Sequence, residues 1–273
     1  MGDVTTPLPL NLQRGTYAPS GPNDKRTPCP VINSLANHGY INRTGRNIHA
    51  SQLQAAINEV GLSRALGALL TNSIFNEQQD SKAVSMQKKP SLLARIWAII
   101  RNPWIVMARF GMRRRDQVDS QGRKVLDLDQ FAIPGIVEHD VSLSRCDHQQ
   151  KEGNLVLQQD LVEDLLASST DGKVLTVEDL AAFRKRRIQR QLDDNPGLKY
   201  GPQEHKTGCS ELGLILGVFG NGKSIPCEYA RALFKEERLP VKEGWRKHWL
   251  WTFGFLELFR STKQVQTAIG IRL

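Results

Sequence analysis

The sequence contains one cysteine in a setting that could make its sulfur a metal ligand or a nucleophile. Cys29 stands between Pro28 and Pro30 and opens an apolar, helix-like segment. Proline suits the first turn of a helix, where its missing N–H leaves no group unsatisfied. We therefore expect Cys29 at a helix N-terminus, where the amides of Val31 and Ile32 point back at the sulfur and favour the thiolate. The alternative is a buried structural cysteine in a proline-bounded turn.

A second group of chemically active side chains lies at residues 138–142, which read Glu-His-Asp-Val-Ser. Glu138, His139 and Ser142 place a carboxylate, an imidazole and a hydroxyl within five residues. Such a group can form a cation site, and oxygen ligands suit a hard ion such as Mg²⁺ or Mn²⁺. The alternative is a hydrogen-bonded turn, because short polar side chains readily bond to nearby backbone groups.

A third candidate is Glu211, a single carboxylate near the start of the apolar segment 208–219. Taken alone, it is an ordinary first-turn glutamate, which the helix dipole favours. Glu204 and Glu228 are neighbouring carboxylates, and the residue types alone do not decide among the three.

Longer motifs surround these three candidates. The N-terminal ones are Pro-Cys-Pro at 28–30, Asn33, Leu35, Asn-His-Gly-Tyr at 37–40, Gly45 and Asn47-Ile48; the later ones are Glu-His-Asp-x-Ser at 138–142, Gly-Asn at 220–221, Phe-x-x-Glu-Arg-Leu-Pro at 234–240 and Gly244-Trp245. Together they resemble the fungal haem-thiolate peroxidases, the family of chloroperoxidase and the unspecific peroxygenases. The resemblance covers about residues 27–75 and 126–248.

The resemblance implies a role for each candidate. Cys29 would be the axial ligand of the iron of haem b, and Glu211 would lie over the distal face of the haem. The Glu138 carboxylate, the His139 backbone carbonyl and the Ser142 hydroxyl would help to hold Mg²⁺ or Mn²⁺ beside a haem propionate. Glu211 as acid and base, oriented by His139, would activate hydrogen peroxide. The expected function is a peroxidase or peroxygenase that oxygenates a small apolar organic substrate in fungal secondary metabolism.

Two functions of other classes remain open. A haem-binding member of the family could perform a non-redox step, such as a rearrangement or a dehydration. A membrane-associated or partner-binding helical protein would keep Cys29 for structural reasons only. The absorbance of the purified protein separates these two, because the second would lack a Soret band.

Length, cysteine spacing and the N-terminus narrow the class of protein. The 273 residues, 40% of them hydrophobic, can build one large domain. The four cysteines (Cys29, Cys146, Cys209 and Cys227) show no CxxC or zinc spacing, and they imply no disulfide framework. Residues 1–26 are polar and lack the apolar core of a signal peptide, which predicts an intracellular protein.

The net charge of +9 arises in one segment of the chain. Residues 81–115 contain nine lysines and arginines and no acidic residue. Subtracting these nine from the 37 basic residues leaves 28, which equals the 28 acidic residues. A nucleic-acid partner is therefore not expected, because the rest of the protein is neutral.

The same segment is amphipathic. On a helical wheel, one face collects Leu92, Leu93, Ile96, Trp97, Ile99, Ile100, Trp104 and Met107, and the other side carries Arg95, Arg101 and Arg109. The internal arginines and Pro103 argue against a membrane span. Two placements remain open for residues 88–115: a helix packed on the haem domain, or a helix in the membrane interface whose arginines meet anionic lipid.

Most of the remaining chain has apolar residues at helical spacing. It predicts helices at 30–40, 50–60, 62–75, 152–167, 177–192, 210–219, 226–238 and 247–262. Because no useful alternating run is present, we expect an all-α fold in a single domain. This domain would span residues 27–262, after an N-terminal arm (1–26) and before a C-terminal tail (263–273), with a basic insertion at about 82–124. Its helices must bring Cys29, residues 138–142 and Glu211 together.

Overall fold

The computed structural model describes residues 12–78, 91, 97, 110–195, 197–198, 200–248 and 250–271. The predicted amphipathic helix lies almost entirely outside these residues. Its placement on the domain or on a membrane therefore stays a prediction. In the part of the chain that is described, no helix combines the length and the apolar character that crossing a bilayer requires.

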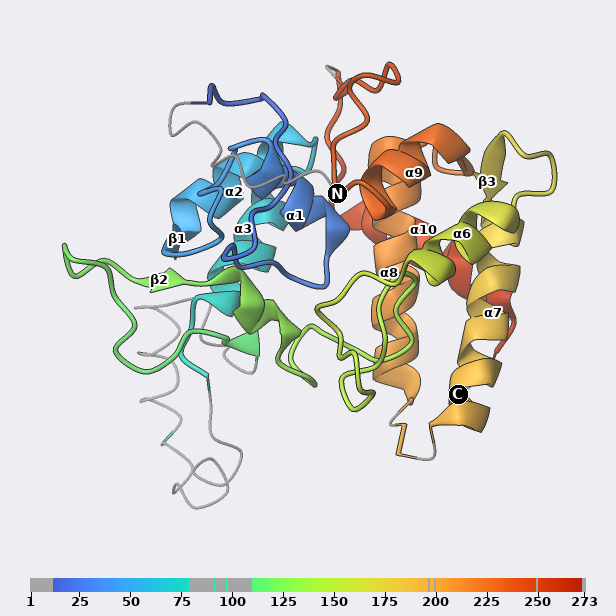
Figure 1. Cartoon of the computed structure of the whole chain (residues 1–273), viewed down its shortest axis with the longest axis horizontal. Helices are drawn as coiled ribbons and strands as arrows, with labels where there is room; N and C mark the ends of the chain where they lie inside the picture. The colour runs from blue at the N-terminus through green and yellow to red at the C-terminus, as the bar shows by residue number, and fades with distance from the viewer. Residues whose placement is uncertain are drawn as a thin grey trace, which may run out of the picture.

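The fold is mostly helical, as predicted, and the two halves of the chain lie side by side (Figure 1). The N-terminal half contributes α1 (Pro30–Asn37), α2 (Ala50–Glu59) and α3 (Arg64–Ile74), and the C-terminal half contributes α6 (Gln159–Ala167), α7 (Val177–Asp194), α8 (Pro202–Phe219), α9 (Cys227–Phe234) and α10 (Phe255–Ile269). Between the halves lies a short 3₁₀ helix, η2 (Leu128–Ala132).

Two small antiparallel sheets accompany the helices. Strand β1 (Ile48–His49) pairs with β2 (Val125–Leu126), and β3 (Val174–Thr176) pairs with β4 (Ser224–Pro226). The sequence did not predict them, because strands of two or three residues are too short to show alternation.

Side-chain caps explain where two of the long helices begin. Helix α7 begins with a capping box: Thr176 accepts a hydrogen bond from the Asp179 N–H (3.1 Å), and the Asp179 carboxylate accepts one from the Thr176 N–H (3.0 Å). Helix α8 begins at Pro202, eight residues before its predicted start. There the Glu204 carboxylate accepts the Gly201 N–H (2.9 Å). The first turns of α8 are polar, so the spacing of apolar residues does not reveal this part of the helix.

Helix α10 lies further along the chain than predicted. It was expected at residues 247–262, but the described residues 246–248 and 250–254 are not helical and the helix runs from Phe255 to Ile269. Val265 and Ile269 are buried and hold its second half against the protein. Gly270 then ends the helix with a φ of 69°. The helix thus continues into the stretch expected to be a C-terminal tail.

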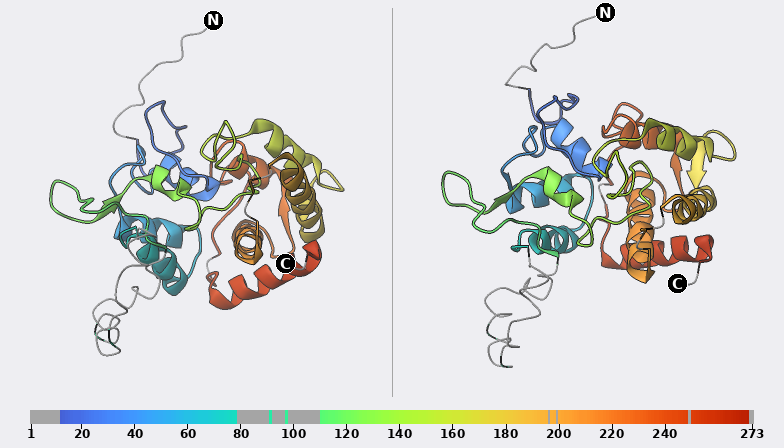
Figure 2. Two further views of the ribbon diagram at one scale, coloured as in Figure 1. Left: turned by 90° about the horizontal axis from the view of Figure 1, so that it is seen from below. Right: turned by 60° about the horizontal axis from the view of Figure 1, so that its bottom comes forward.

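Helix α8 is the centre of the C-terminal half. Helix α10 packs against α8 and α7 and crosses α8 rather than running alongside it (Figure 2). Two glycines of α8 allow this close approach. A Cβ atom on Gly217 would lie 2.1 Å from the Phe253 ring, and one on Gly213 would lie 2.6 Å from the Ser261 hydroxyl oxygen.

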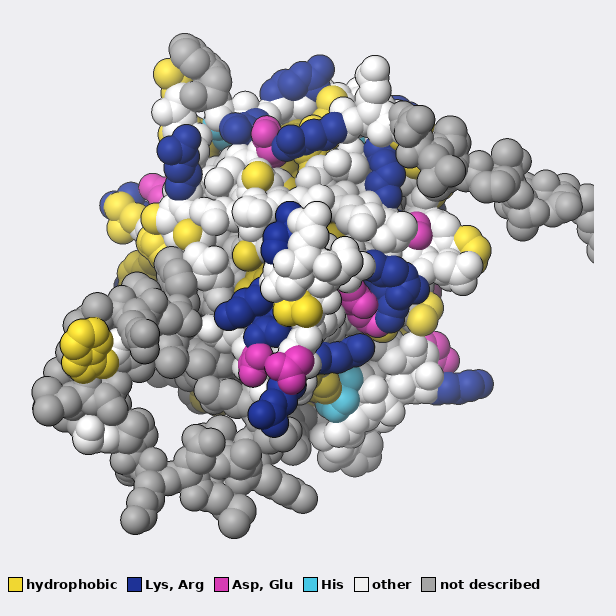
Figure 3. Space-filling view, turned by 90° about the vertical axis from the view of Figure 1, so that its left-hand side faces the viewer, with side chains coloured by type: hydrophobic (Ala, Val, Ile, Leu, Met, Phe, Trp, Pro, Cys, Tyr) yellow, Lys and Arg dark blue, Asp and Glu magenta, His cyan; other side chains and the backbone are white. Residues whose placement is uncertain are grey.

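Residues 76–78 and 112–113 run side by side, so two described segments that are more than 30 positions apart in the sequence are paired. The Gln78 N–H donates to the Arg113 carbonyl (2.8 Å), and the Arg113 N–H donates to the Asn76 carbonyl (3.2 Å). The buried Met112 extends this pairing, because its N–H donates to the Ile74 carbonyl. On the face in Figure 3, basic side chains are interspersed with acidic ones among the described residues.

Candidate active site

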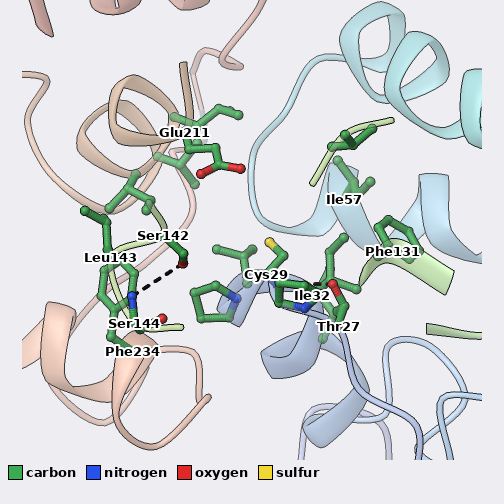
Figure 4. Close-up of a pocket in the computed structure, with 18 of the residues that line it drawn as sticks. Thr27, Cys29, Ile32, Ile57, Phe131, Ser142, Leu143, Ser144, Glu211 and Phe234 are labelled. Carbon is green, nitrogen blue, oxygen red and sulfur yellow. Dashed lines mark hydrogen bonds between the residues drawn. The ribbon is translucent and has the colours of Figure 1, made fainter. Parts of the chain in front are cut away.

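An apolar pocket lies between the two halves of the chain. Its walls come from α1, α2, α3, α8 and α9 and from the loops around residues 27–29 and 137–144. It contains about 1120 Å³ of space free of protein atoms, part of it open to solvent. The Cys29 sulfur, at the start of α1, and the Glu211 carboxylate, from α8, both point into this space (Figure 4).

Cys29 is the N-cap residue of α1, and Pro30 is its first helical residue, as expected. The amides of Ile32 and Val31 donate hydrogen bonds to the sulfur. Burial outweighs these bonds and raises the pKa of the Cys29 thiol to about 11. The two amides lower this pKa, as expected of a helix N-terminus, but burial has the larger effect and favours the thiol.

Asn33 holds the loop that carries Cys29. Its side-chain oxygen accepts the Thr27 N–H (2.9 Å), and its side-chain amide donates to the Thr27 carbonyl (2.7 Å). The Thr27 hydroxyl in turn accepts the Cys29 N–H (3.1 Å). Because Asn33 and Thr27 are buried, these bonds fix the backbone on which the sulfur is mounted.

Glu237 ties α1 to the other half of the chain, and sequence reasoning missed this role. Its carboxylate accepts a hydrogen bond from the Asn33 side chain (2.7 Å) and forms an ion pair with Arg145, whose side chain is 1% exposed. The Glu237 carbonyl also accepts a bond from Asn37 (3.0 Å). The only available signal was the place of Glu237 in the Phe-x-x-Glu-Arg-Leu-Pro stretch.

Glu211 and His139 lie together, as the sequence predicted. The His139 Nε2 atom is 3.2 Å from the Glu211 Oε2 atom, across 72 residues of sequence. The Nδ1 atom of His139 lies 2.8 Å from the Asp140 carbonyl, to which it donates. Nε2 of a neutral imidazole would then be an acceptor, so the bond to Glu211 requires one additional proton, shared by the pair.

His139 and Glu211 each stabilise the charged form of the other. Burial lowers the pKa of His139, but the Glu211 carboxylate outweighs burial and leaves that pKa raised. Enclosure in the pocket raises the pKa of Glu211, whose side chain is 49% exposed, but His139 outweighs it and leaves that pKa lowered. Both shifts favour the form of the pair in which the imidazole is charged and the carboxylate is ionised.

Two arginines of α7 fix the backbone of the loop that carries His139. Arg184 donates from Nη1 to the Val141 carbonyl (3.1 Å), and Arg187 donates from Nε and Nη2 to the Ser142 carbonyl (both 3.3 Å). Arg184 lies so close to α8 that a Cβ atom on Gly208 would be 1.8 Å from its Nη2 atom. Sequence reasoning missed Arg184, Arg187 and Gly208, because no local pattern marks them.

The three predicted cation ligands lie on one wall of the pocket. Glu138, His139 and Ser142 all line it. Burial is the main reason that the pKa of Glu138 is raised, to about 8. No cluster of three or more His, Cys, Asp or Glu side chains suited to a metal occurs in the described part of the chain. The predicted ligands are one carboxylate, one backbone carbonyl and one hydroxyl, so this cation site stays a prediction.

Comparison of the sequence with known proteins identifies a family and several relatives. The sequence profile of the family described as "Peroxidase, family 2" matches residues 15–249. Chloroperoxidase of Leptoxyphium fumago is 48% identical over 60 residues, which are 22% of this chain and 16% of that protein. Dothistromin biosynthesis peroxidase dotB of Dothistroma septosporum is 27% identical over 176 residues, 64% of this chain and 37% of that protein.

A third relative, aromatic peroxidase fscJ of Fusarium equiseti, is 25% identical over 204 residues, which are 71% of this chain and 39% of that protein. The chain thus spans well under half of the length of the curated relatives that it matches. The profile match nevertheless covers most of the chain, from before Cys29 to beyond Glu237. The resemblance seen in the sequence is confirmed: the chain belongs to the family Peroxidase, family 2.

Proposed function

We propose that this protein is a haem-thiolate peroxidase or peroxygenase that uses hydrogen peroxide to oxidise a small apolar organic substrate. The observation that carries this proposal is the pocket itself, in which the Cys29 sulfur faces the same apolar space as the Glu211–His139 pair. Membership of the peroxidase family and the peroxidase names of its relatives support it.

The residues of the pocket fit a thiolate-ligated haem b. The space is large and mainly apolar, which suits a porphyrin, and one sulfur with two amide hydrogen bonds projects into it. Cys29 would bind the iron, and the positive charge of the iron would stabilise the thiolate that burial disfavours. When bound, a haem with a thiolate ligand supplies iron chemistry that favours cleavage of the peroxide O–O bond.

Glu211 is the proposed acid and base for this cleavage. Heterolytic cleavage of hydrogen peroxide requires one proton to move from one peroxide oxygen to the other. The Glu211 carboxylate can accept that proton and then return it. His139 Nε2, at 3.2 Å, orients the carboxylate and balances its charge. The His139–Asp140 bond keeps the imidazole in this orientation.

The walls of the pocket favour an apolar substrate. Around Glu211 they are formed by aliphatic and aromatic side chains, among them Leu70, Leu214, Ile215, Val218 and Phe219. Such walls bind by burial of apolar surface and offer few polar partners. The names of two relatives, a dothistromin biosynthesis peroxidase and an aromatic peroxidase, agree with a substrate from secondary metabolism.

A divalent cation completes the proposed site. Glu138, the His139 carbonyl and Ser142 would supply oxygen ligands at the pocket wall, and these suit Mg²⁺, with Mn²⁺ as the alternative. The arginines of α7 hold the Val141 and Ser142 carbonyls and so keep the ligand loop in place. The cation would offset the charge of a haem propionate.

The spectrum of the reduced CO complex tests the proposal. The purified protein should show the red-shifted Soret band of a thiolate ligand and should consume peroxide with an apolar substrate. Cys29→Ala should lose both properties. Cys146→Ala, which changes another partly buried cysteine, should retain both. A thiolate-type spectrum in Cys29→Ala would rule out the assignment, and a protein that never takes up haem would rule out the function.

A further inference from the structure

Large apolar side chains are exposed where the chain enters α10. Their exposed fractions are 75% for Leu250, 43% for Trp251, 48% for Phe255, 54% for Leu256 and 67% for Phe259. Single exposed apolar residues are ordinary, but five within ten residues form a surface feature that needs an explanation. We call these five residues the α10 patch.

The apolar side chains of the patch that belong to α10 lie on the side of the helix that faces away from the domain. The opposite side of α10 is packed on α7 and α8 and buries Ser261, Thr262, Val265 and Ile269. The helix is therefore anchored, and its apolar surface points outward from a fixed position. Because α10 is held in place, its exposed apolar side chains are available to contact another surface and not the core of the same domain.

Basic side chains border the α10 patch. Arg246 and Lys247 precede it and are exposed. Arg260 and Lys263 are exposed as well, and each lies one helical turn beyond Leu256 or Phe259 on the same surface. Residues 246–263 contain one acidic residue, Glu257.

The carboxylate of Glu257 already accepts the Gly254 N–H (3.0 Å) at the start of α10. Two other carboxylates reach this border: Glu59 lies 3.9 Å from Lys247, and Glu178 lines a surface hollow with Phe259, Arg260 and Lys263. Four basic side chains against three acidic ones leave the border with a small positive charge, which fits an anionic surface.

The patch begins next to the wall of the pocket. The Phe253 N–H donates to the Gly61 carbonyl (2.8 Å), and the Phe253 carbonyl accepts the Ser63 N–H (2.9 Å). Leu62, which these bonds flank, lines the pocket. Only Gly254 separates Phe253 from Phe255, so the helical part of the patch directly follows a residue that is hydrogen-bonded to the pocket wall.

We propose that the α10 patch docks the protein on the surface of an anionic lipid membrane. Tryptophan and phenylalanine favour the level of the lipid headgroups, and neighbouring lysine and arginine are attracted to anionic lipid. The neighbouring apolar pocket could then receive a lipid-dissolved substrate close to the bilayer. This docking surface is distinct from residues 88–115, and vesicle binding requires no haem chemistry.

Vesicle flotation of the full-length protein tests the proposal. Phosphatidylcholine vesicles that contain phosphatidylserine should carry the protein at low salt, and vesicles of phosphatidylcholine alone should carry much less. Phe255→Ser/Phe259→Ser should reduce the apparent partition coefficient by at least about tenfold, because two large apolar side chains no longer enter the interface. Arg260→Gln/Lys263→Gln should reduce it by roughly fivefold for each charge removed.

Matched variants control for general loss of apolar surface and charge. Leu192→Ser removes an apolar side chain of similar exposure (49%) near the end of α7. Lys185→Gln/Lys206→Gln removes two exposed charges from α7 and α8. Both variants should bind vesicles as the unmodified protein does.

Two results would overturn the proposal. The first is vesicle binding that is absent, or that is unchanged in Phe255→Ser/Phe259→Ser. The second is a stable oligomer in solution that dissociates in this variant, because the patch would then join two copies of the chain.

Discussion

Asn33 and Glu237 are joined by a hydrogen bond of 2.7 Å between positions 204 residues apart. Asn33 lies one turn after Cys29 on α1, and Glu237 follows α9. The carboxylate that receives this bond also pairs with the buried Arg145. The position of the cysteine sulfur in the pocket is therefore linked, through Asn33, to an ion pair with a buried arginine.

Replacement of Glu237 should destabilise the protein strongly. In Glu237→Gln, Arg145 keeps its charge at 1% exposure but loses its carboxylate. An uncompensated buried charge costs about 3–5 kcal/mol. Urea denaturation should show this loss in the free energy of unfolding. The control is Glu236→Gln, whose carboxylate is 41% exposed and should cost less than about 1 kcal/mol. Equal losses in both variants would contradict the role given to Glu237.

Replacement of Glu211 should slow peroxide activation without loss of haem. Glu211→Gln keeps the size of the side chain but removes the proton acceptor, so the rate should fall by roughly 10²–10⁴-fold. Stopped-flow absorbance after mixing with peroxide measures this rate.

His139→Ala should have a smaller effect on the same rate, because it removes only the partner of Glu211, and it should also weaken retention of the cation near Glu138. Metal analysis after gel filtration reports on that retention. If Glu211→Gln reacts with peroxide at the unmodified rate, the base is a different residue.

Gly208→Ala should displace Arg184. The new Cβ atom would lie 1.8 Å from the Arg184 Nη2 atom, so the guanidinium must move away from the Val141 carbonyl. We expect a loss of about 1–3 kcal/mol in the free energy of unfolding, although alanine favours a helix more than glycine does. Peroxide activation should slow as well, because the His139 loop loses a contact. Thr207→Ala, on the same turn of α8, should leave both quantities nearly unchanged.

The Arg238–Glu243 ion pair should make stability depend on pH. Arg238 donates from Nη2 to Glu243 Oε1 (2.6 Å) and from Nη1 to Oε2 (2.9 Å). These bonds hold the pKa of Glu243 below its usual range. As pH falls through that range, near 4.3, the unfolded chain binds a proton before the folded one does. The contribution is therefore complete above this pH and is lost below it.

Glu243→Gln should accordingly cost about 1.5–3 kcal/mol at neutral pH and much less in acid. Urea denaturation at both pH values checks this difference. The control is Glu59→Gln, which changes a half-exposed glutamate and should cost less than about 1 kcal/mol at neutral pH. A cost for Glu243→Gln that is the same at both pH values would show that the pair does not titrate as described.

The sequence identified the groups that face the pocket better than the groups that hold them. Cys29 and Glu211 lie in motifs that carry a family resemblance, and a local pattern also marks the Thr176 cap. Arg145 and Arg184 act on partners that are distant in sequence, so no local spacing reveals them. Helix boundaries were missed for a related reason. Helix α8 begins in a polar stretch, and α10 is placed by burial of Val265 and Ile269 rather than by its exposed apolar residues.

The division of the pocket between the two halves of the chain has a consequence for biosynthesis. Cys29 leaves the ribosome long before Glu211, which follows 182 positions later. At typical elongation rates of about 5–20 residues per second, this delay is roughly 10–40 s. Throughout this interval the wall formed by α8 and α9 does not exist. The pocket proposed to hold the haem is therefore complete only after the C-terminal helices have been synthesised and have packed against the N-terminal half.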